Sequence, residues 1–275
     1  MEDFSIFTSI RYDPSLLNIP SEGFLNIGWN QRPSPFYMLD FHRDRMLRAA
    51  SYWGWTAAIE AISGESGLEN LQSFLQSVVR HVTDGPHRIK MTLTQDGTLD
   101  HEISSFPETR LNNLFPDFLP KPTVEESAHV GEGKKIPFRD PVYELLLDSQ
   151  ITTKSEFTHH KTTKRAMYND ARDRCQVRPA DKKEVLVVNE DGHIMEGTIS
   201  TPYFWRAGKW VTPPVPKRFD TSQGSGGNDG TTRRWALERN ITTEQVVLAN
   251  SLIDGEECWI SNGLRGFICG KVKLR

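Results

Sequence analysis

The sequence predicts an α+β fold. Segments that alternate apolar and polar residues occur in pairs around short turn signals, as in antiparallel hairpins. Segments with apolar residues at helical spacing lie between these pairs. Hairpins interleaved with helices are typical of α+β proteins, whereas all-parallel sheets belong to α/β folds. A chain of 275 residues is long enough for one large domain or two smaller ones.

The first part of the chain predicts a small α+β domain over residues 1–114. Asp96-Gly97 is the strongest signal, because an Asp-Gly pair between two alternating segments is typical of a tight β-hairpin turn. An earlier segment places Met46, Ala50 and Trp53 at helical spacing. The expected elements are a strand at 4–12, helices at 39–55 and 68–82, and paired strands at 88–94 and 98–104.

Residues 115–135 change in character and predict a connection between domains. Pro116, Pro120 and Pro122 disfavour a regular element, and a glycine- and lysine-rich stretch follows them. We expect a second, larger domain over residues 136–275. Its expected elements are a strand at 143–148, a β-like segment ending at Phe157, a helix to about Arg174, hairpins at 184–196 and 203–212, a helix at 231–239, and strands at 257–261 and 267–272.

Composition and charge exclude several function classes. The net charge is −3 with both signs well mixed, which gives no basis for a nucleic-acid or membrane partner. Cys175, Cys258 and Cys269 are widely spaced and include no CxxC pair, so neither a disulfide framework nor a metal site is expected. The first residues lack signal-peptide features and the apolar runs are too short to span a bilayer, so we expect a cytoplasmic protein.

The most informative segment is the lysine-rich run around Lys161. It lies behind the β-like segment ending at Phe157 and just before a helical run to about Arg174. A lysine at a strand-to-helix junction can hold an aldehyde cofactor as a Schiff base. Taken alone, however, a cluster of lysine and arginine is more often a solvated surface.

Two further segments suit the same kind of cofactor. Glu196 ends a hydrophobic strand, where a carboxylate needs a partner such as a protonated pyridine nitrogen; the alternative is a strand-end glutamate that reaches solvent. Gly230, Thr231 and Thr232 stand where a glycine-rich loop turns into a helix. The free amides and the dipole of a helix start favour a phosphate dianion, and the threonine hydroxyls add donors. The alternative there is a surface loop, and the sequence matches neither a P-loop nor a GxGxxG motif.

Two arginine-containing segments complete the candidate site. Arg45 follows His42 in a basic helical run, which can supply a phosphate ligand or simply form a basic helix face. Asn262 and Arg265 lie in a polar turn between two strands. An arginine in such a loop can bind a carboxylate, but an ordinary hairpin turn explains the pattern equally well.

Together these segments resemble the class IV aminotransferase family, and within it the aminodeoxychorismate lyases. The resemblance runs from about Phe4 to Val272. It has two departures: the family normally has one more strand or hairpin before the segment that begins at Phe7, and Lys164 stands where many relatives have asparagine. The motifs that carry it are Phe7-Thr8-Ser9-Ile10-Arg11, His42 with Arg45, His160-Lys161-Thr162-Thr163-Lys164-Arg165 with Tyr168, Glu196-Gly197-Thr198-Ile199-Ser200, Thr212-Pro213-Pro214, Gly230-Thr231-Thr232-Arg233 and Asn262-Gly263-Leu264-Arg265-Gly266.

The resemblance implies a small α+β N-terminal domain, a larger C-terminal pseudo-barrel domain, pyridoxal 5'-phosphate as the cofactor, and a homodimer. It implies Lys161 as the catalytic Schiff-base lysine and Glu196 as the partner of the pyridine nitrogen. The other implied cofactor contacts are Arg45, Arg165, Thr198, Gly230, Thr231 and Thr232. The implied substrate contacts are Arg11, Asn262 and Arg265.

The activity that the resemblance favours is conversion of 4-amino-4-deoxychorismate to 4-aminobenzoate and pyruvate, a step in folate precursor synthesis. Two alternatives stay open. A class IV transaminase acting on an amino acid or amine shares the first half of the chemistry. A non-catalytic relative that only binds the cofactor is the alternative from another class.

Overall fold

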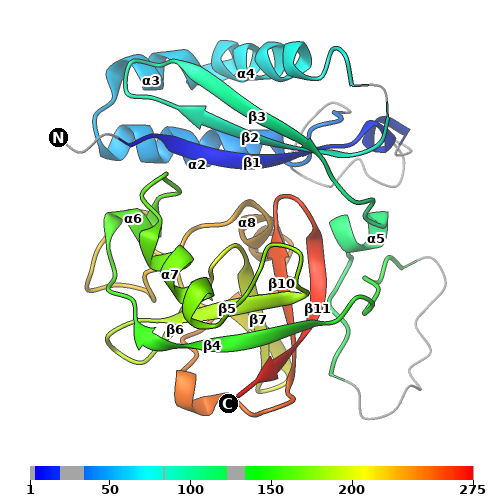
Figure 1. Ribbon diagram of the computed structural model, residues 1–275, viewed down its shortest axis with the longest axis vertical. Coiled ribbons are helices and arrows are strands. Elements are labelled where there is room, and N and C mark those ends of the chain that lie inside the picture. The colour runs from blue at the N-terminus through cyan, green and yellow to red at the C-terminus, as the bar shows by residue number, and fades with distance from the viewer. Residues whose placement is uncertain (1–3, 19–33, 83, 123–133, 275) are drawn as a thin grey trace. The chain divides into compact units, whose positions relative to one another are not determined.

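The computed structural model describes residues 4–18, 34–82, 84–122 and 134–274, which form two compact units (Figure 1). The first unit comprises residues 1–108 together with the short segment His160–Lys164. The second comprises residues 109–159 and 165–275. The first boundary therefore falls after Glu108 rather than after residue 114, and the segment around Lys161 returns to the first unit.

The first unit is a three-stranded antiparallel sheet covered by helices (Figure 1). Alternate residues of the middle strand, Ile89, Met91 and Leu93, are buried and pack with helical residues such as Leu71 and Leu75. The strands, in sheet order, are β1 (Ile6–Tyr12), β2 (His87–Leu93) and β3 (Leu99–Ser105), and the helices are η1 (Pro14–Asn18), α2 (Leu39–Tyr52), α3 (Thr56–Ile62) and α4 (Gly64–Val78).

The segment around Lys161 adds to the free edge of β1. Ile6 bridges to Thr162 in antiparallel fashion, the Phe7 amide donates to the Lys161 carbonyl at 3.0 Å, and the Thr163 amide donates to the Ser5 carbonyl at 2.9 Å. Main-chain hydrogen bonds on both sides of Lys161 therefore fix its backbone against β1.

The second unit is built on an eight-stranded mixed sheet that curls into a half-barrel (Figure 1). The strand order is β6-β5-β4-β11-β10-β7-β8-β9, and the edge strand β6 also contacts β7, the sixth strand in this order, so the sheet curls round. The strands are β4 (Tyr143–Ile151), β5 (Lys183–Val188), β6 (Ile194–Gly197), β7 (Thr201–Arg206), β8 (Lys209–Thr212), β9 (Thr243–Glu244), β10 (Glu257–Asn262) and β11 (Gly266–Lys273).

Helices of the second unit lie against this sheet. α7 packs on β4 and β5, α8 packs on β10, and α5 packs on β11. Neighbouring residues Leu145 and Leu146 of β4 belong to different apolar clusters, because successive side chains of a strand point to opposite faces. The bounds of these helices are α5 (Leu111–Leu114), α6 (Glu156–His159), α7 (Ala166–Arg174), α8 (Thr231–Glu238) and η2 (Ala249–Ser251).

The structure confirms the α+β class and the small and large units, and it corrects several details. The predicted β-like segment ending at Phe157 is wrong: β4 ends at Ile151 and Glu156–His159 is a short helix. The helix predicted over 39–55 ends at Tyr52, because Gly54 has a positive φ of 64° and a new helix starts at Thr56. Part of the predicted connection, 123–133, lies outside the described residues.

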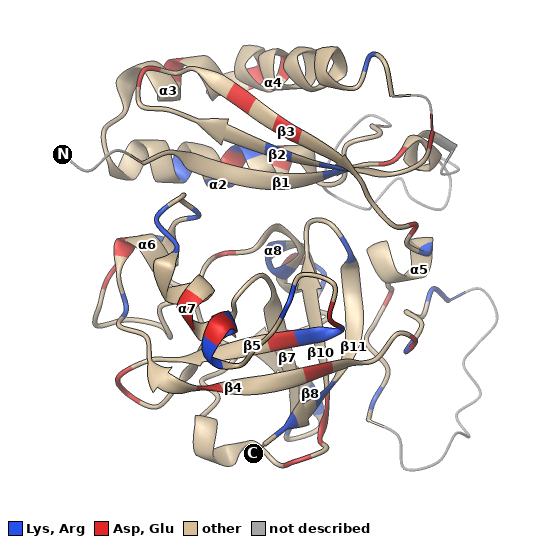
Figure 2. Cartoon of the chain, viewed as in Figure 1, with Lys and Arg blue, Asp and Glu red and all other residues tan. Residues whose placement is uncertain are grey.

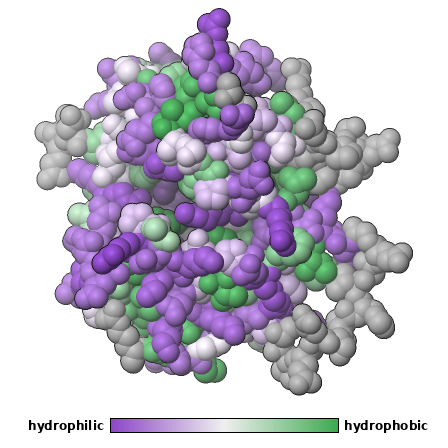
Figure 3. All heavy atoms as spheres, turned by 45° about the vertical axis from the view of Figure 1, so that its right-hand side comes forward, coloured by the Kyte–Doolittle hydropathy of each residue, from purple (hydrophilic) through white to green (hydrophobic). Residues whose placement is uncertain are grey.

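The surface carries both signs of charge and scattered apolar residues. Lysine and arginine are interspersed with aspartate and glutamate in both units (Figure 2). On the face drawn in Figure 3, apolar residues form separate patches among polar ones. Within the described ranges of the chain, no helix is both long and apolar enough to cross a membrane.

Asn113 joins three segments of the second unit and should be important for its stability. Its amide nitrogen donates to the carbonyls of Phe267 at 2.8 Å and Phe138 at 3.0 Å, and its oxygen accepts from the Phe138 amide at 3.1 Å. Asn113→Ala leaves these buried groups without their partner, so urea unfolding should show a loss of about 1–3 kcal/mol. Asn112→Ala is the control on the same helix, and equal effects of the two changes would contradict this role.

Candidate active site

The first unit holds a polar chain of the half-buried Arg45 and the buried Thr8 and His42. Arg45 Nη2 donates to Thr8 Oγ1 at 2.7 Å, and the same hydroxyl is hydrogen-bonded to His42 Nδ1 at 2.6 Å. Burial lowers the pKa of His42 well below its ordinary value, and the positive charges of Arg45 and Lys161 add to this effect. The neutral form of His42 is therefore favoured in the folded protein.

Lys161 lies in the same unit as this chain. Its Nζ stands 4.7 Å from the centroid of the Phe7 ring. The preceding residue, His160, packs its ring 4.8 Å from Tyr52 and 5.0 Å from Trp53. The backbone hydrogen bonds to β1 and this ring packing together fix the lysine at a defined place, with Arg45 close enough for both to act on His42.

The second unit holds Glu196 at the end of β6. Its side chain is 8% exposed, and Tyr168 of α7 donates to Glu196 Oε1 at 2.5 Å. Burial raises the pKa of Tyr168 well above its ordinary value, and the Glu196 charge and hydrogen bond raise it further. Tyr168 is therefore a permanent donor, and the carboxylate meets the partner that its burial requires.

Glycines bring the loop before α8 against β6 and β7. A Cβ at Gly227 would lie 2.6 Å from the Met195 carbonyl oxygen and 3.2 Å from Glu196 Cβ. A Cβ at Gly230 would lie 2.9 Å from Thr201 Oγ1. The start of α8 is thus held beside the strands that carry Glu196 and Thr201, at a distance that only glycine permits.

The start of α8 has the character of an anion site. The Thr231 side chain is buried, and its Oγ1 has no hydrogen-bond partner among the described residues. Thr232 Oγ1 is 2.7 Å from Ser261 Oγ, which also bonds the Tyr203 hydroxyl at 2.7 Å. The first amides of a helix lack intrahelical acceptors, so a buried hydroxyl beside them adds a donor for an anion.

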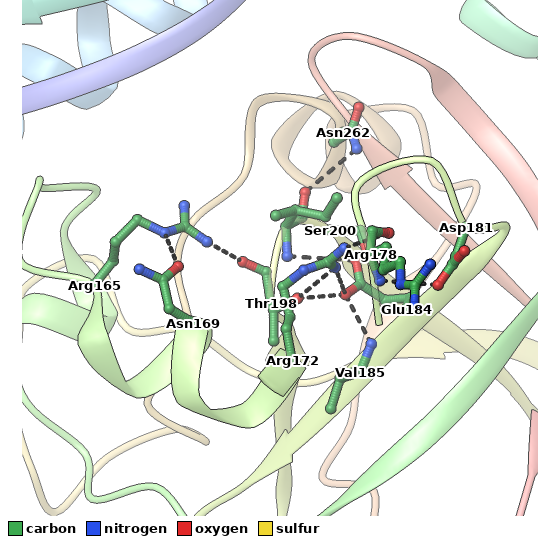
Figure 4. A network of polar contacts seen from close by, with 11 residues as sticks. Arg165, Asn169, Arg172, Arg178, Asp181, Glu184, Val185, Thr198, Ser200 and Asn262 are labelled. Carbon is green, nitrogen blue, oxygen red and sulfur yellow. Dashed lines mark hydrogen bonds and ion pairs between the residues drawn. The ribbon is translucent and has the colours of Figure 1, made fainter. Parts of the chain in front are cut away.

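The loop between β10 and β11 is organised by Asn262. Its Oδ1 accepts from the amides of Leu264 at 3.0 Å and Arg265 at 2.9 Å, and its Nδ2 donates to the Ile199 carbonyl at 3.3 Å. One side chain therefore shapes the loop that carries Arg265 and ties it to the turn after β6 (Figure 4).

The structure gives Arg165 and Thr198 internal partners. Arg165 Nη2 donates to the Thr198 carbonyl at 3.1 Å, its guanidinium lies 5.5 Å from the Tyr168 ring, and burial lowers its pKa. The Thr198 hydroxyl donates to Glu184 at 2.7 Å. Both residues thus take part in the polar contacts around the turn after β6 (Figure 4).

Arg11 has internal partners within the first unit. Its side chain is buried, its Nε and Nη2 donate to Asp13 Oδ2 at 2.9 and 2.7 Å, and its Nη1 donates to the Pro107 carbonyl at 3.0 Å. These contacts favour a structural role, so we do not carry Arg11 into the proposed substrate contacts.

The predicted residues therefore form two groups, one in each unit. Arg11, Arg45 and Lys161 share the first, and the others share the second: Arg165, Glu196, Thr198, Gly230, Thr231, Thr232, Asn262 and Arg265. Residues that sequence reasoning gave no role are Thr8, Glu184, Ser200 and Ser261, and it left the contacts of Tyr168 open. Thr8 and Ser200 lie inside conspicuous motifs, but nothing in the local pattern marks Glu184 or Ser261.

Comparisons with known proteins agree on one family. Residues 27–270 match the family model described as "Amino-transferase class IV". A Schizosaccharomyces pombe protein named "Putative aminodeoxychorismate lyase" is 31% identical over 270 residues, covering 96% of this chain and 88% of that protein.

Solved structures share the fold at low identity. A Mesorhizobium loti protein described as "Putative amino-acid aminotransferase" has a TM-score of 0.65 at 20% identity, covering 98% of this chain and 100% of that one. The PLP-bound form of a hypothetical aminotransferase from Mycobacterium tuberculosis has a TM-score of 0.58 at 14% identity, covering 98% and 81%. At such identities the likeness establishes the fold alone.

His42 should make the stability of the protein depend on pH. Its folded-state pKa lies well below the ordinary 6.5, near which the unfolded chain takes up a proton. Stability should therefore be full above about pH 6.5 and fall below it toward the folded-state pKa, by about 1.4 kcal/mol per pH unit. Urea unfolding between about pH 7.5 and 5 should show a flatter dependence for His42→Asn. Exposed His101→Asn is the control, and equal slopes for wild type and His42→Asn would refute the assignment.

Proposed function

Because the chain belongs to the class IV aminotransferase family, we propose that it binds pyridoxal 5'-phosphate and converts 4-amino-4-deoxychorismate to 4-aminobenzoate and pyruvate. The observation that carries the choice of reaction is the 31% identity, over 96% of this chain, to a protein named as an aminodeoxychorismate lyase. A structure of the same fold is described in its PLP-bound form, which supports the cofactor.

The residues of the second unit fit this cofactor. The buried Thr231 Oγ1 lacks a partner among the described residues, and the glycines before α8 leave no room for a side chain. The helix start and this hydroxyl suit a phosphate dianion. Glu196 of β6, whose carboxylate accepts a hydrogen bond from Tyr168 of α7, suits a protonated pyridine nitrogen.

In this proposal each cofactor-binding residue has a defined role. Thr231, Thr232 and the first amides of α8 would bind the phosphate, together with Arg45. Glu196 would hold the proton on the pyridine nitrogen, with Tyr168 orienting its carboxylate. Lys161 would bind the aldehyde carbon through Nζ. The cofactor supplies that aldehyde and a conjugated ring that accepts electrons.

Lys161 would also move the essential proton. When the substrate amine takes its place, the Nζ becomes free to act as a base. It would remove the proton from the ring carbon that bears the amine. The bond between the ring and the enolpyruvyl oxygen would then break, and the released enolate would take up a proton to become pyruvate. The ring would become aromatic, which makes the step strongly downhill.

The proposed substrate contacts lie on the loop between β10 and β11. The substrate carries two carboxylates, so its pocket needs cationic or multiple donors. Arg265 would bind one carboxylate, and Asn262 would fix the loop, as its bonds to the amides of Leu264 and Arg265 suggest. The homodimer that the resemblance implies stays a prediction.

Transamination is the second candidate, because the family model and the Mesorhizobium loti and Mycobacterium tuberculosis structures are described as aminotransferases. Removal of the same proton begins both reactions. The lyase and transaminase reactions then release different products, so measurement of the products distinguishes them.

Lys161→Ala should abolish covalent attachment of the cofactor. Borohydride treatment of the wild type should fix the cofactor to the peptide that contains Lys161, as detected by mass spectrometry, and turnover should fall by at least about 10³-fold in the variant. Lys164→Ala is the matched control, because Lys164 Nζ also lies over an aromatic ring, that of Phe4 at 5.4 Å. Wild-type turnover in Lys161→Ala would rule out this lysine.

Arg265→Ala should separate substrate binding from cofactor binding. Loss of a charged donor to a desolvated carboxylate should cost roughly 2–5 kcal/mol in kcat/KM for 4-aminobenzoate release, with the bound cofactor's absorbance spectrum unchanged. Arg265→Lys keeps the charge without the planar guanidinium, so its kcat/KM should lie between those of the wild type and Arg265→Ala. If Arg265→Ala is silent, or if the wild type transfers amino groups from simple amines faster than it releases 4-aminobenzoate, the lyase assignment fails.

A further inference from the structure

Glu184 is a buried carboxylate that the proposed chemistry does not use. It lies on β5 and is 1% exposed. Its oxygens accept from the hydroxyls of Thr198 at 2.7 Å and Ser200 at 2.6 Å, and from the Val185 amide at 2.8 Å. The Ile199 amide is 3.4 Å away, and Arg172 Nη1 forms an ion pair at 3.7 Å. Burial of a charge is costly, so a carboxylate here is stable only with such a set of donors, and it holds those donors in place.

The carboxylate acts on the turn that joins β6 to β7. Three of its donors, from Thr198, Ile199 and Ser200, come from successive residues of this turn (Figure 4). A Cβ at Gly197 would lie 2.8 Å from Glu184 Cγ, so the side chain packs directly on the turn backbone. Hydrogen bonds to an ionised acceptor are about twice as strong as neutral ones, so Glu184 fixes the conformation of the turn.

The turn is hydrogen-bonded to the loop between β10 and β11, which carries Arg265. The Ile199 carbonyl accepts from Asn262 Nδ2 at 3.3 Å. Asn262 Oδ1 in turn accepts from the amides of Leu264 and Arg265. A continuous series of contacts therefore runs from Glu184 through the turn to Asn262 (Figure 4), and from Asn262 to the backbone of Arg265.

Glu196 is next to this network but is held differently. Its Oε1 accepts from Tyr168 of α7, and no described hydrogen bond joins Glu184 to Glu196. Loss of the Glu184 charge should therefore loosen the turn and the Asn262 loop while the Tyr168–Glu196 pair stays in place.

We propose that Glu184 is a positioning residue for substrate recognition: it fixes the turn at Gly197–Ser200, and through Asn262 it sets the place of Arg265. Its role is separate from cofactor binding. Its meaning for catalysis rests on the proposed function, because Arg265 is there assigned to a substrate carboxylate. The network itself belongs to the protein whatever its substrate.

The test compares two buried carboxylates on neighbouring strands. Glu184→Gln keeps the size and one acceptor but removes the charge, and Ser200→Ala removes one donor if the first variant folds poorly. Asp148→Asn is the matched control, because Asp148 is 6% exposed and accepts two bonds from Arg174 at 2.9 and 2.6 Å, away from the turn.

Amide hydrogen exchange in the cofactor-free protein is the first readout. Glu184→Gln and Ser200→Ala should each raise exchange of the Ile199, Leu264 and Arg265 amides by about 10-fold or more, whereas Asp148→Asn should leave these amides unchanged. Unchanged exchange at Leu264 and Arg265 in both variants would overturn the proposal, as would an equal rise in Asp148→Asn.

Steady-state kinetics of the cofactor-loaded protein is the second readout. Glu184→Gln should raise KM for 4-amino-4-deoxychorismate by about 10-fold while kcat and the cofactor dissociation constant change by less than about 3-fold. A fall in cofactor affinity with unchanged KM would overturn the assignment to substrate recognition. If wild-type protein releases no 4-aminobenzoate but the exchange pattern appears, the proposed function fails and the network stands.

Discussion

Burial of carboxylates beside the curled sheet is the constraint on which the second unit's candidate site depends. Glu184, Glu196 and Asp148 are each less than a tenth exposed, and each has its own kind of partner. Turn hydroxyls and amides satisfy Glu184, Tyr168 satisfies Glu196, and Arg174 satisfies Asp148. Since a buried polar group left without its partner costs about 1–3 kcal/mol, these pairings favour one arrangement of the surrounding loops.

Close backbone approach positions the loop before α8, just as a buried charge positions the turn after β6. Gly227 lies against Met195 and Glu196, and Gly230 lies against Thr201. Any side chain at either position would push the start of α8 away from the strands. The glycines therefore set how near a helix start, with its free amides, comes to a buried carboxylate, which is the combination that an anionic, nitrogen-containing cofactor needs.

The path of the chain explains how Lys161 gains a fixed backbone without lying in a strand of the large sheet. Residues 160–164 leave the second unit, add to the edge of β1, and return. The ring of His160 packs against both Tyr52 and Trp53 as the segment begins. The same unit supplies Arg45 and His42, and the positive charges of Arg45 and Lys161 help burial to keep the pKa of His42 low.

The sequence by itself determined the hairpins, most helices, the α+β class and the motifs that contain Lys161, Glu196 and Gly230. Period and turn chemistry are local, so they can be recognised without a structure. Tertiary structure alone decided that Arg45 bonds Thr8, 37 residues away, and that Glu184 anchors a turn. It also decided that Asn113 bonds Phe267, 154 residues away. Such partners meet only after the chain has folded, because burial and distant strand pairing, not local pattern, choose which polar groups must satisfy one another.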